Sequence, residues 1–249
     1  MKKLSIILIL IVIIVIIICL IIKPKESFIT YKGFEYSDKF SKSDIEDLKK
    51  GQERMTKMFK EFDRICRKYK LKYWCVGGTL IGVLRHKGWI PFDGDIDVGM
   101  TQNDYTKLQK IVQNELPEGM WFQDKTTDKF YKSNIGKIRD INSNYKDYKS
   151  RATHNGMQLD IFIFKADNDT YTGENRTFNK KHIFPLKELM FEDIKVFVPN
   201  DCDTYLKKFG KNYENYMELP NIKNRYPHEG RVELSAPSWV KEKYPHLYN

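Results

Sequence analysis

Residues 74–100, WCVGGTLIGVLRHKGWIPFDGDIDVGM, contain the pattern that decides the fold. A short apolar run ends at two glycines, and a second apolar run carries aspartates at alternating positions. The first run predicts a short buried strand, because it is β-prone and ends at the glycine pair. The second predicts another strand over 95–100, in which residues two apart share one face. We therefore expect Asp95 and Asp97 to project together, with Asp93 at the entrance to the strand.

The close spacing of these aspartates favours a divalent cation. Carboxylates held this close repel one another, and one pKa would rise unless a cation lay between them. Mg²⁺ or Mn²⁺, hard ions with oxygen ligands, would resolve the conflict and keep open positions for phosphate oxygens. An EF-hand loop does not fit, because Val98 stands where glycine is required and Asp104 where glutamate belongs.

Gly77 and Gly78 favour phosphate chemistry when they are combined with the aspartates. Glycines directly after a strand let the backbone approach a ligand, and Thr79 would open a helix whose free N–H groups attract phosphate. Taken alone, the glycine pair is as well explained by a tight turn. A nucleotidyltransferase-type site needs a third carboxylate from a neighbouring strand, and Asp160 in the run QLDIFIF is the candidate. The alternative is that Asp160 is an exposed strand residue.

The rest of the chain predicts one α/β or α+β domain. A helix is expected from Ser43, and a second one runs to Leu116 with Asn103 as its cap. SNIGKIRDIN and GMQLDIFIF read as strands, NDTYTG as a turn and IFPLKELMFEDIKVFVPN as a hairpin. A short helix then has Asp201 at its cap and stops at Gly210. The first helix has an apolar face formed by Met55, Met58, Phe59, Phe62, Ile65, Cys66 and Tyr69.

The first 25 residues predict a membrane anchor. The apolar run from Leu4 to Ile22, interrupted only by Ser5, would span about 28 Å as a helix, close to the thickness of a bilayer's hydrocarbon core. It is longer than the apolar region of a signal peptide and lacks a small-residue cleavage pattern. Bulky Ile18 before Cys19 argues against lipidation. An uncleaved anchor is therefore favoured over a signal peptide.

This anchor sets the predicted organisation of the chain. Residues 1–25 are the tail and anchor, 26–50 a stem and 51–249 the catalytic domain. The flanking lysines are nearly balanced, so the short tail and the folded mass after the anchor decide the orientation. We expect a single-pass type II protein with its domain in a lumen (Golgi or endoplasmic reticulum in a eukaryote) or outside the cytoplasm. Asn168 and Asn175 would then be possible glycosylation acceptors in a eukaryote.

Charge and cysteine content exclude several classes. The net charge is +10, of which four lysines in residues 1–25 contribute +4, leaving +6. A mildly basic domain suits nucleotide, phosphoglycan or anionic-lipid partners, although a lysine-rich solvated surface explains it equally well. No basic stripe with interleaved aromatic residues indicates a nucleic-acid groove. Cys66, Cys75 and Cys202 form neither zinc-site spacing nor a disulfide framework.

The stretch GGTLIGVLRHKGWIPFDGDIDVGM closely resembles the signature of the LicD family, which includes the fukutin-related proteins and bacterial phosphocholine transferases. The likeness continues at KIRDINS, GMQLDIFIF, FPLKELMFEDIKVFVPND and YLKKFGKNYENYMELP, over roughly residues 60–228. Gly94 replaces the middle acid of the family's common D-D-D run, and Phe92 replaces a tryptophan. The resemblance implies a nucleotidyltransferase-like mixed sheet flanked by helices. It also implies transfer of a phospho-substituent from a CDP-linked donor to a glycan hydroxyl.

The resemblance also implies roles for residues. It assigns the metal ions to Asp95, Asp97 and Asp160 with support from Asp93, and donor phosphate to Gly77, Gly78, Thr79, Arg85 and His86. Asp160 is expected nearest the attacking oxygen, where it would assist deprotonation. Lys137 and Arg139 alternate onto one strand face, where they would neutralise phosphate charge. The alternative is that both are solvated basic residues on an edge strand.

Two other functions fit part of the pattern. Many glycosyltransferases are single-anchor proteins that hold a nucleotide-sugar through an Asp-x-Asp metal site. The glycine pair before the aspartates argues against that class, because it belongs to the nucleotidyltransferase arrangement. A non-catalytic, membrane-tethered binding protein is the second alternative, and the complete set of carboxylates argues against it.

Overall fold

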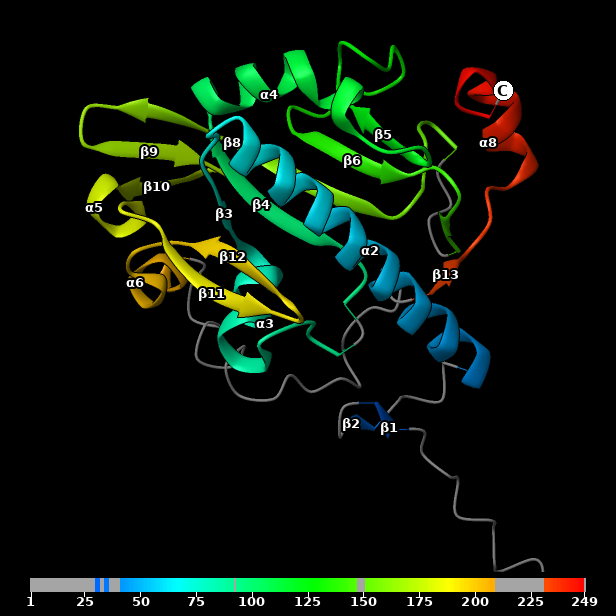
Figure 1. Ribbon diagram of the computed structural model, residues 1–249, viewed down its shortest axis with the longest axis horizontal. Coiled ribbons are helices and arrows are strands. Elements are labelled where there is room, and N and C mark those ends of the chain that lie inside the picture. The colour runs from blue at the N-terminus through cyan, green and yellow to red at the C-terminus, as the bar shows by residue number, and fades with distance from the viewer. Residues whose placement is uncertain are drawn as a thin grey trace, which may run out of the picture.

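The computed structural model describes residues 30–31, 34–35, 41–91, 93–146, 151–208 and 231–248. Figure 1 shows a mixed sheet crossed by the long helix α2, with α4 along its upper edge. The helices are α2 (Lys42–Lys68), α3 (Gly77–His86), α4 (Gln102–Glu115), α5 (Lys180–Ile183), α6 (Cys202–Lys207), α8 (Ser238–Lys243) and the 3₁₀ helix η3 (Pro245–Leu247). The strands are β1 (Thr30–Tyr31), β2 (Phe34–Glu35), β3 (Tyr73–Cys75), β4 (Ile96–Thr101), β5 (Met120–Gln123), β6 (Gly136–Asp140), β7 (Asn144–Tyr145), β8 (Gln158–Asp167), β9 (Thr170–Gly173), β10 (Arg176–Asn179), β11 (Lys187–Phe191), β12 (Ile194–Val198) and β13 (Val232–Glu233).

The largest sheet has seven strands and is built around β8. Its main path is β10-β9-β8-β4-β3, while β6 pairs with β8 and β5 pairs with β6. Strands β4 and β8 run parallel, and the other pairs of this sheet are antiparallel. Because β8 is ten residues long, its first half contacts β4 and β6 and its end contacts β9. The predicted mixed α/β architecture is confirmed.

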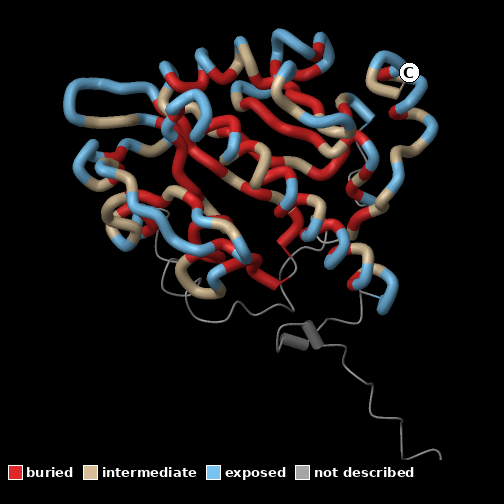
Figure 2. Tube along the Cα trace, in the orientation of Figure 1, coloured by how far each residue is buried: buried red, intermediate tan, exposed pale blue. Residues whose placement is uncertain are grey.

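The core lies between α2 and one face of this sheet. Figure 2 shows the strands of the sheet interior as buried and the outer surfaces of the helices as exposed. The predicted apolar face of α2 is buried, as shown by Met55, Phe59 and Phe62, which are 0% exposed. Tyr69, assigned to the same face, is instead 39% exposed. That prediction was wrong because the helix ends at Lys68, and Tyr69 is the residue that caps it.

Two predicted boundaries differ from those in the structure. Helix α4 is capped by Thr101, whose Oγ1 accepts from the N–H of Asp104 at 3.1 Å, and Asn103 lies inside the helix. Helix α2 begins at a Ser41 capping box and runs through residue 50, so it crosses the division drawn between stem and domain.

The second half of the chain follows the sequence closely. NDTYTG is a turn only at its start, because Thr170–Gly173 form β9. The predicted hairpin is β11 paired with β12, and Asp201 caps α6 by accepting from Thr204 N–H at 3.0 Å. Gly210 lies outside the described residues.

Within the described ranges, no helix is both long and apolar enough to cross a bilayer. Residues 4–22, for which the sequence predicts an anchor, lie outside those ranges.

Candidate active site

The register between β4 and β8 brings the predicted carboxylates together. Asp97 lies directly opposite Asp160 in the parallel pair, and Asp95 immediately precedes β4. One carboxylate oxygen from each of Asp95, Asp97 and Asp160 lies within 4.8 Å of the others. Asp160 is only 7% exposed, so the alternative of an exposed strand residue is wrong. Asp93 is buried at the entrance to β4 and is not part of this converging set.

This carboxylate cluster has the electrostatics of a cation site. Burial raises the pKa of the Asp97 carboxyl well above its usual range, and the charges of Asp95 and Asp160 raise that pKa further. Crowded carboxylates of this kind favour a hard divalent cation with oxygen ligands. The three side chains therefore fit such an ion by ligand type and by their mutual distance.

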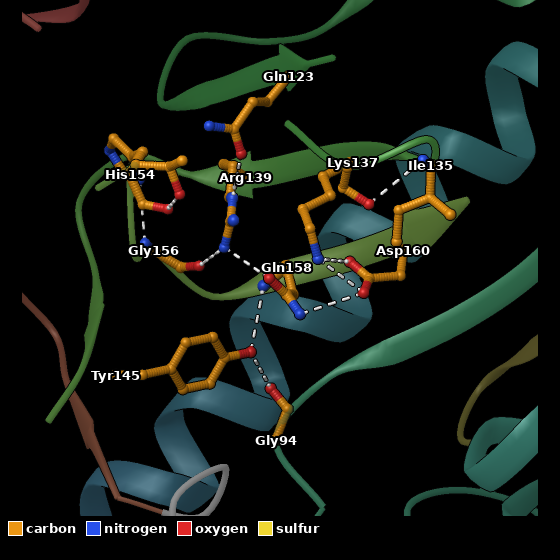
Figure 3. A network of polar contacts seen from close by, with 12 residues as sticks. Gly94, Gln123, Ile135, Lys137, Arg139, Tyr145, His154, Gly156, Gln158 and Asp160 are labelled. Carbon is orange, nitrogen blue, oxygen red and sulfur yellow. Dashed lines mark hydrogen bonds and ion pairs between the residues drawn. The ribbon is translucent and has the colours of Figure 1, made fainter. Parts of the chain in front are cut away.

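Lys137 provides the positive charge nearest to Asp160. It lies opposite Asp160 in the antiparallel β6–β8 pair, and its Nζ contacts both carboxylate oxygens at 2.6 and 2.7 Å. Burial lowers the pKa of this lysine, while the charge of Asp160 opposes that effect. Gln158 Nε2 donates to Asp160 Oδ2 at 3.2 Å, as Figure 3 shows. Lys137 is therefore a buried partner of the cluster, and its reading as a solvated residue is wrong.

Arg139 is buried in a different network on the same strand. Its Nε donates to Gln123 Oε1 at 2.7 Å, and its Nη1 donates to Gly156 O at 2.7 Å and to Gln158 Oε1 at 2.6 Å (Figure 3). Because Gln158 in turn donates to Asp160, Arg139 acts on the cluster through an intermediate side chain. The reading of Arg139 as a solvated residue is wrong as well.

Tyr145 joins the two segments that carry the acids, although no sequence pattern singles it out. Its hydroxyl donates to Gly94 O at 2.7 Å and accepts from Gln158 N–H at 3.3 Å. Gly94 lies between Asp93 and Asp95, and Gln158 opens the strand that carries Asp160 (Figure 3). Tyr145 stands on the two-residue strand β7, too short to produce a hydrophobic period.

The glycine pair packs against the acids. Gly77 has a φ of +51°, which favours glycine, and an added Cβ would lie 3.2 Å from Asp97 Oδ2. At Gly78, an added Cβ would lie 3.1 Å from Asp93 Oδ2. Thr79 Oγ1 accepts from the Asp97 N–H at 2.8 Å. The glycines thus allow the start of α3 to approach the carboxylates closely.

The N-terminus of α3 has two features that favour an anion. Its N-cap, Val76, makes no side-chain hydrogen bond to the helix, and the first turn contains no acidic residue. The N–H groups of a first helical turn and the helix dipole attract negative charge. Arg85 and His86, predicted to reach donor phosphate, stand in the last turn of α3, about 9 Å along the axis from Thr79. Arg85 Nε donates to His86 Nε2 at 2.8 Å.

Glu174 is a further acid that the sequence did not single out. It stands in the turn between β9 and β10, and its Oε2 is buried with no hydrogen-bond partner among the described residues. Burial raises its pKa to about 7. Its charge also contributes to the raised pKa of Asp97, so it belongs to the electrostatic surroundings of the cluster.

A mixed sheet with carboxylates converging from neighbouring strands is the arrangement expected of a nucleotidyltransferase-type domain. The chain matches the model of the "LicD/FKTN/FKRP, nucleotidyltransferase domain" family over residues 70–201, more than half of its 249 residues. It belongs to the LicD family.

Several curated relatives have named activities. The chain is 37% identical over 106 residues to the lipopolysaccharide cholinephosphotransferase LicD of Haemophilus influenzae, covering 41% of this chain and 38% of that protein. It is 31% identical over 152 residues to the ribitol-5-phosphate transferase FKTN of Mus musculus, covering 57% and 29%. It is 23% identical over 159 residues to the ribitol 5-phosphate transferase FKRP of Homo sapiens, covering 61% and 30%. The chain spans less than two thirds of the length of each.

Proposed function

We propose that this protein is a metal-dependent phosphotransferase that moves a phospho-substituent from a CDP-linked donor to a glycan hydroxyl. The observation that carries the proposal is the convergence of Asp95, Asp97 and Asp160 beside the uncapped start of α3. A cation site beside an anion site is what the diphosphate of a nucleotide-linked donor requires. The printed activities of the relatives support phosphocholine or ribitol phosphate as the group transferred.

The residues of the site have distinct roles in this reaction. Asp95, Asp97 and Asp160 would hold Mg²⁺ or Mn²⁺, which when bound neutralises phosphate charge and lowers the pKa of the incoming hydroxyl. The N–H groups at the start of α3 orient the donor phosphates. The oxygen of the acceptor hydroxyl attacks the phosphorus of the transferred group, and Asp160 accepts the proton of that hydroxyl. The bond between this phosphorus and the oxygen of CMP breaks, and CMP leaves. Lys137 limits the negative charge on Asp160 before the substrates bind.

The protein is also proposed to be membrane-anchored. The apolar run Leu4–Ile22 supports a single type II span, with the domain on the lumenal or extracytoplasmic side. This location would give the site access to glycoconjugates that are assembled there.

A donor panel tests the function. The full chain is incubated with Mn²⁺, a glycan acceptor and CDP-choline or CDP-ribitol, and CMP release and acceptor mass are followed. We expect CMP release and a mass increase equal to the phospho-substituent. Turnover of UDP- or GDP-sugars without use of CDP donors would identify a glycosyltransferase, and binding without any turnover would identify a non-catalytic protein. Either result would overturn the proposal.

A further inference from the structure

A cavity of about 1100 Å³ lies away from the carboxylate cluster. It is bordered by the end of α2 and the loop after it, by the start of α5 and the loop after it, and by β12. Lys72, on its wall, precedes Tyr73, which pairs with Met100 of β4. Asp97 lies three residues before Met100, so the cavity is about 10 Å further along these strands than the cluster. It is lined by Cys66, Arg67, Lys70, Leu71, Lys72, Asp169, Asn179, Lys180, Lys181, Phe184, Pro185, Leu186 and Phe197.

The charge of this cavity is strongly positive. Its lining has five basic side chains and one acidic side chain, Asp169. Arg67 is neutralised, because it pairs with Asp63 and Glu188 at 2.7 Å each. The lysines at the rim form no ion pair within the described part of the chain: Lys70, Lys72, Lys180 and Lys181. The cavity therefore favours an anionic ligand.

The walls of the cavity are apolar. Leu71, Phe184 and Leu186 contribute from two sides, and the guanidinium of Arg67 covers the ring of Phe197 at 4.5 Å from its centroid. Lys72 Nζ lies 5.5 Å from the ring centroid of Phe184. An inorganic anion would leave these walls in contact with water, whereas a ligand with an anionic head and an apolar chain would cover them.

Exposed hydrophobic side chains also lie in segments beside the cavity. Four large hydrophobic side chains of the described residues are exposed, and three of them belong to segments beside this cavity. Tyr69 precedes Lys70, and Leu189 and Met190 follow Glu188, the partner of Arg67. Exposed aromatic and aliphatic side chains next to lysines are typical of surfaces that enter a lipid head-group layer.

We propose that this cavity binds the head group and the adjoining acyl chain of an acidic membrane phospholipid. The four lysines contact the phosphate, the apolar walls cover the start of the chain, and Tyr69 and Met190, which shares a strand face with Glu188 and Phe197, rest in the interface. The inference does not depend on the proposed phosphotransfer, since none of these residues belongs to the carboxylate cluster.

Photo-crosslinking tests the proposal. The full chain is reconstituted in phosphatidylcholine vesicles that contain phosphatidylglycerol with a diazirine-bearing acyl chain, and labelled peptides are quantified by mass spectrometry. We expect label on peptides from 66–72 and 180–186, and at least a tenfold loss in Lys70→Glu/Lys72→Glu. Label on residues 1–25 normalises the yield. The matched charge change Lys107→Glu/Lys110→Glu, on the exposed face of α4, should leave the labelling unchanged.

Three results would overturn the proposal. The first is equal labelling in Lys70→Glu/Lys72→Glu at an unchanged melting temperature. The second is equal labelling by a diazirine-bearing phosphatidylcholine, which would show that the anionic head is irrelevant. The third is complete competition by millimolar inorganic phosphate, which would identify a site for the free ion.

Discussion

The two faces of the paired strands β4 and β8 differ sharply in polarity near Asp97 and Asp160. One face is apolar and closed, and Ile96, Val98 and Ile161 on it are fully buried. The opposite face carries Asp97 beside Asp160. Asp97 lies between Ile96 and Val98 in the sequence, and Asp160 directly precedes Ile161. Because side chains alternate along a strand, ten residues supply both a core and a charged site.

This difference shows how the fold holds a site that opposes folding. Crowding the carboxylates is unfavourable without a cation, as the raised pKa of Asp97 indicates. Burial of the apolar face supplies the stabilisation that offsets this repulsion. Substitutions on the two faces should therefore have opposite signatures: loss of activity on one face, loss of stability on the other.

The largest effect is expected at the acids. Asp97→Asn and Asp160→Asn each remove a negative charge from the proposed cation site, so kcat/KM with a CDP-linked donor should fall on the order of 10³-fold. The melting temperature of Asp97→Asn should not fall, because the substitution relieves repulsion. Asp167→Asn, at the exposed end of β8, is the control and should retain activity. Normal turnover in both site variants would contradict the assignment.

The opposite face should show the reverse. Ile161→Ala removes a fully buried side chain and should lower the free energy of unfolding by about 3 kcal/mol. Ile163, two residues along and only partly buried, should lose about 1 kcal/mol when changed to alanine. Chemical denaturation measures both, and the folded fraction of each variant should retain its activity per molecule. Equal losses of unfolding free energy in the two variants would contradict the expectation that the more buried position contributes more to stability.

The local half of this comparison could be predicted from the sequence. Alternation in DGDID placed Asp95 and Asp97 on one face, and the lone acid in QLDIFIF identified Asp160. Gly77 and Gly78 were expected to let the backbone approach a ligand, which stays a prediction; in the structure they lie against carboxylates. The placement of the acids on strands succeeds because it depends on residues adjacent in sequence.

The long-range half could not be predicted from the residues alone. The pairing of Lys137 with Asp160 depends on the register of β6 against β8, which no local pattern encodes. The short strands β5, β10 and β13 and the helix α8 lack enough residues for a clear period. His154 is fully buried and its Nδ1 accepts from Gly156 N–H at 3.0 Å, an environment that no local pattern indicates.

A substitution at Tyr145 is expected to have smaller effects on both stability and activity. Tyr145→Phe keeps the ring but leaves Gly94 O and Gln158 N–H without this partner, so stability should fall by about 2 kcal/mol. Because the hydroxyl ties the Asp95 loop to the Asp160 strand, the Mn²⁺ concentration for half-maximal activity should rise about tenfold. A stability loss without a change in Mn²⁺ dependence would show that Tyr145 supports the fold and not the site.

Tyr248→Phe is the matched control for that variant. It removes another partly buried tyrosine hydroxyl, which donates to Ile141 O at 2.6 Å and is bonded to His154 Nε2. Its contacts lie outside the two segments that carry the acids. It should lower stability without altering the Mn²⁺ dependence.

The smallest effect is a pH dependence at Glu174. Burial raises its pKa from the usual 4.5 to about 7, so the folded protein binds this proton more tightly than the unfolded chain does. Its contribution to stability is therefore fully present below pH 4.5 and is lost as the pH rises through about 7. Glu174→Gln removes that loss. In metal-free protein, its stability relative to the wild type should increase between pH 4.5 and 8 by at most about 2 kcal/mol, because solvent reaches part of the residue. Denaturation across this range measures the change, with the exposed Glu118→Gln as a control for net charge. A difference that does not vary with pH would place the Glu174 carboxylate in water, outside the electrostatic surroundings of Asp97.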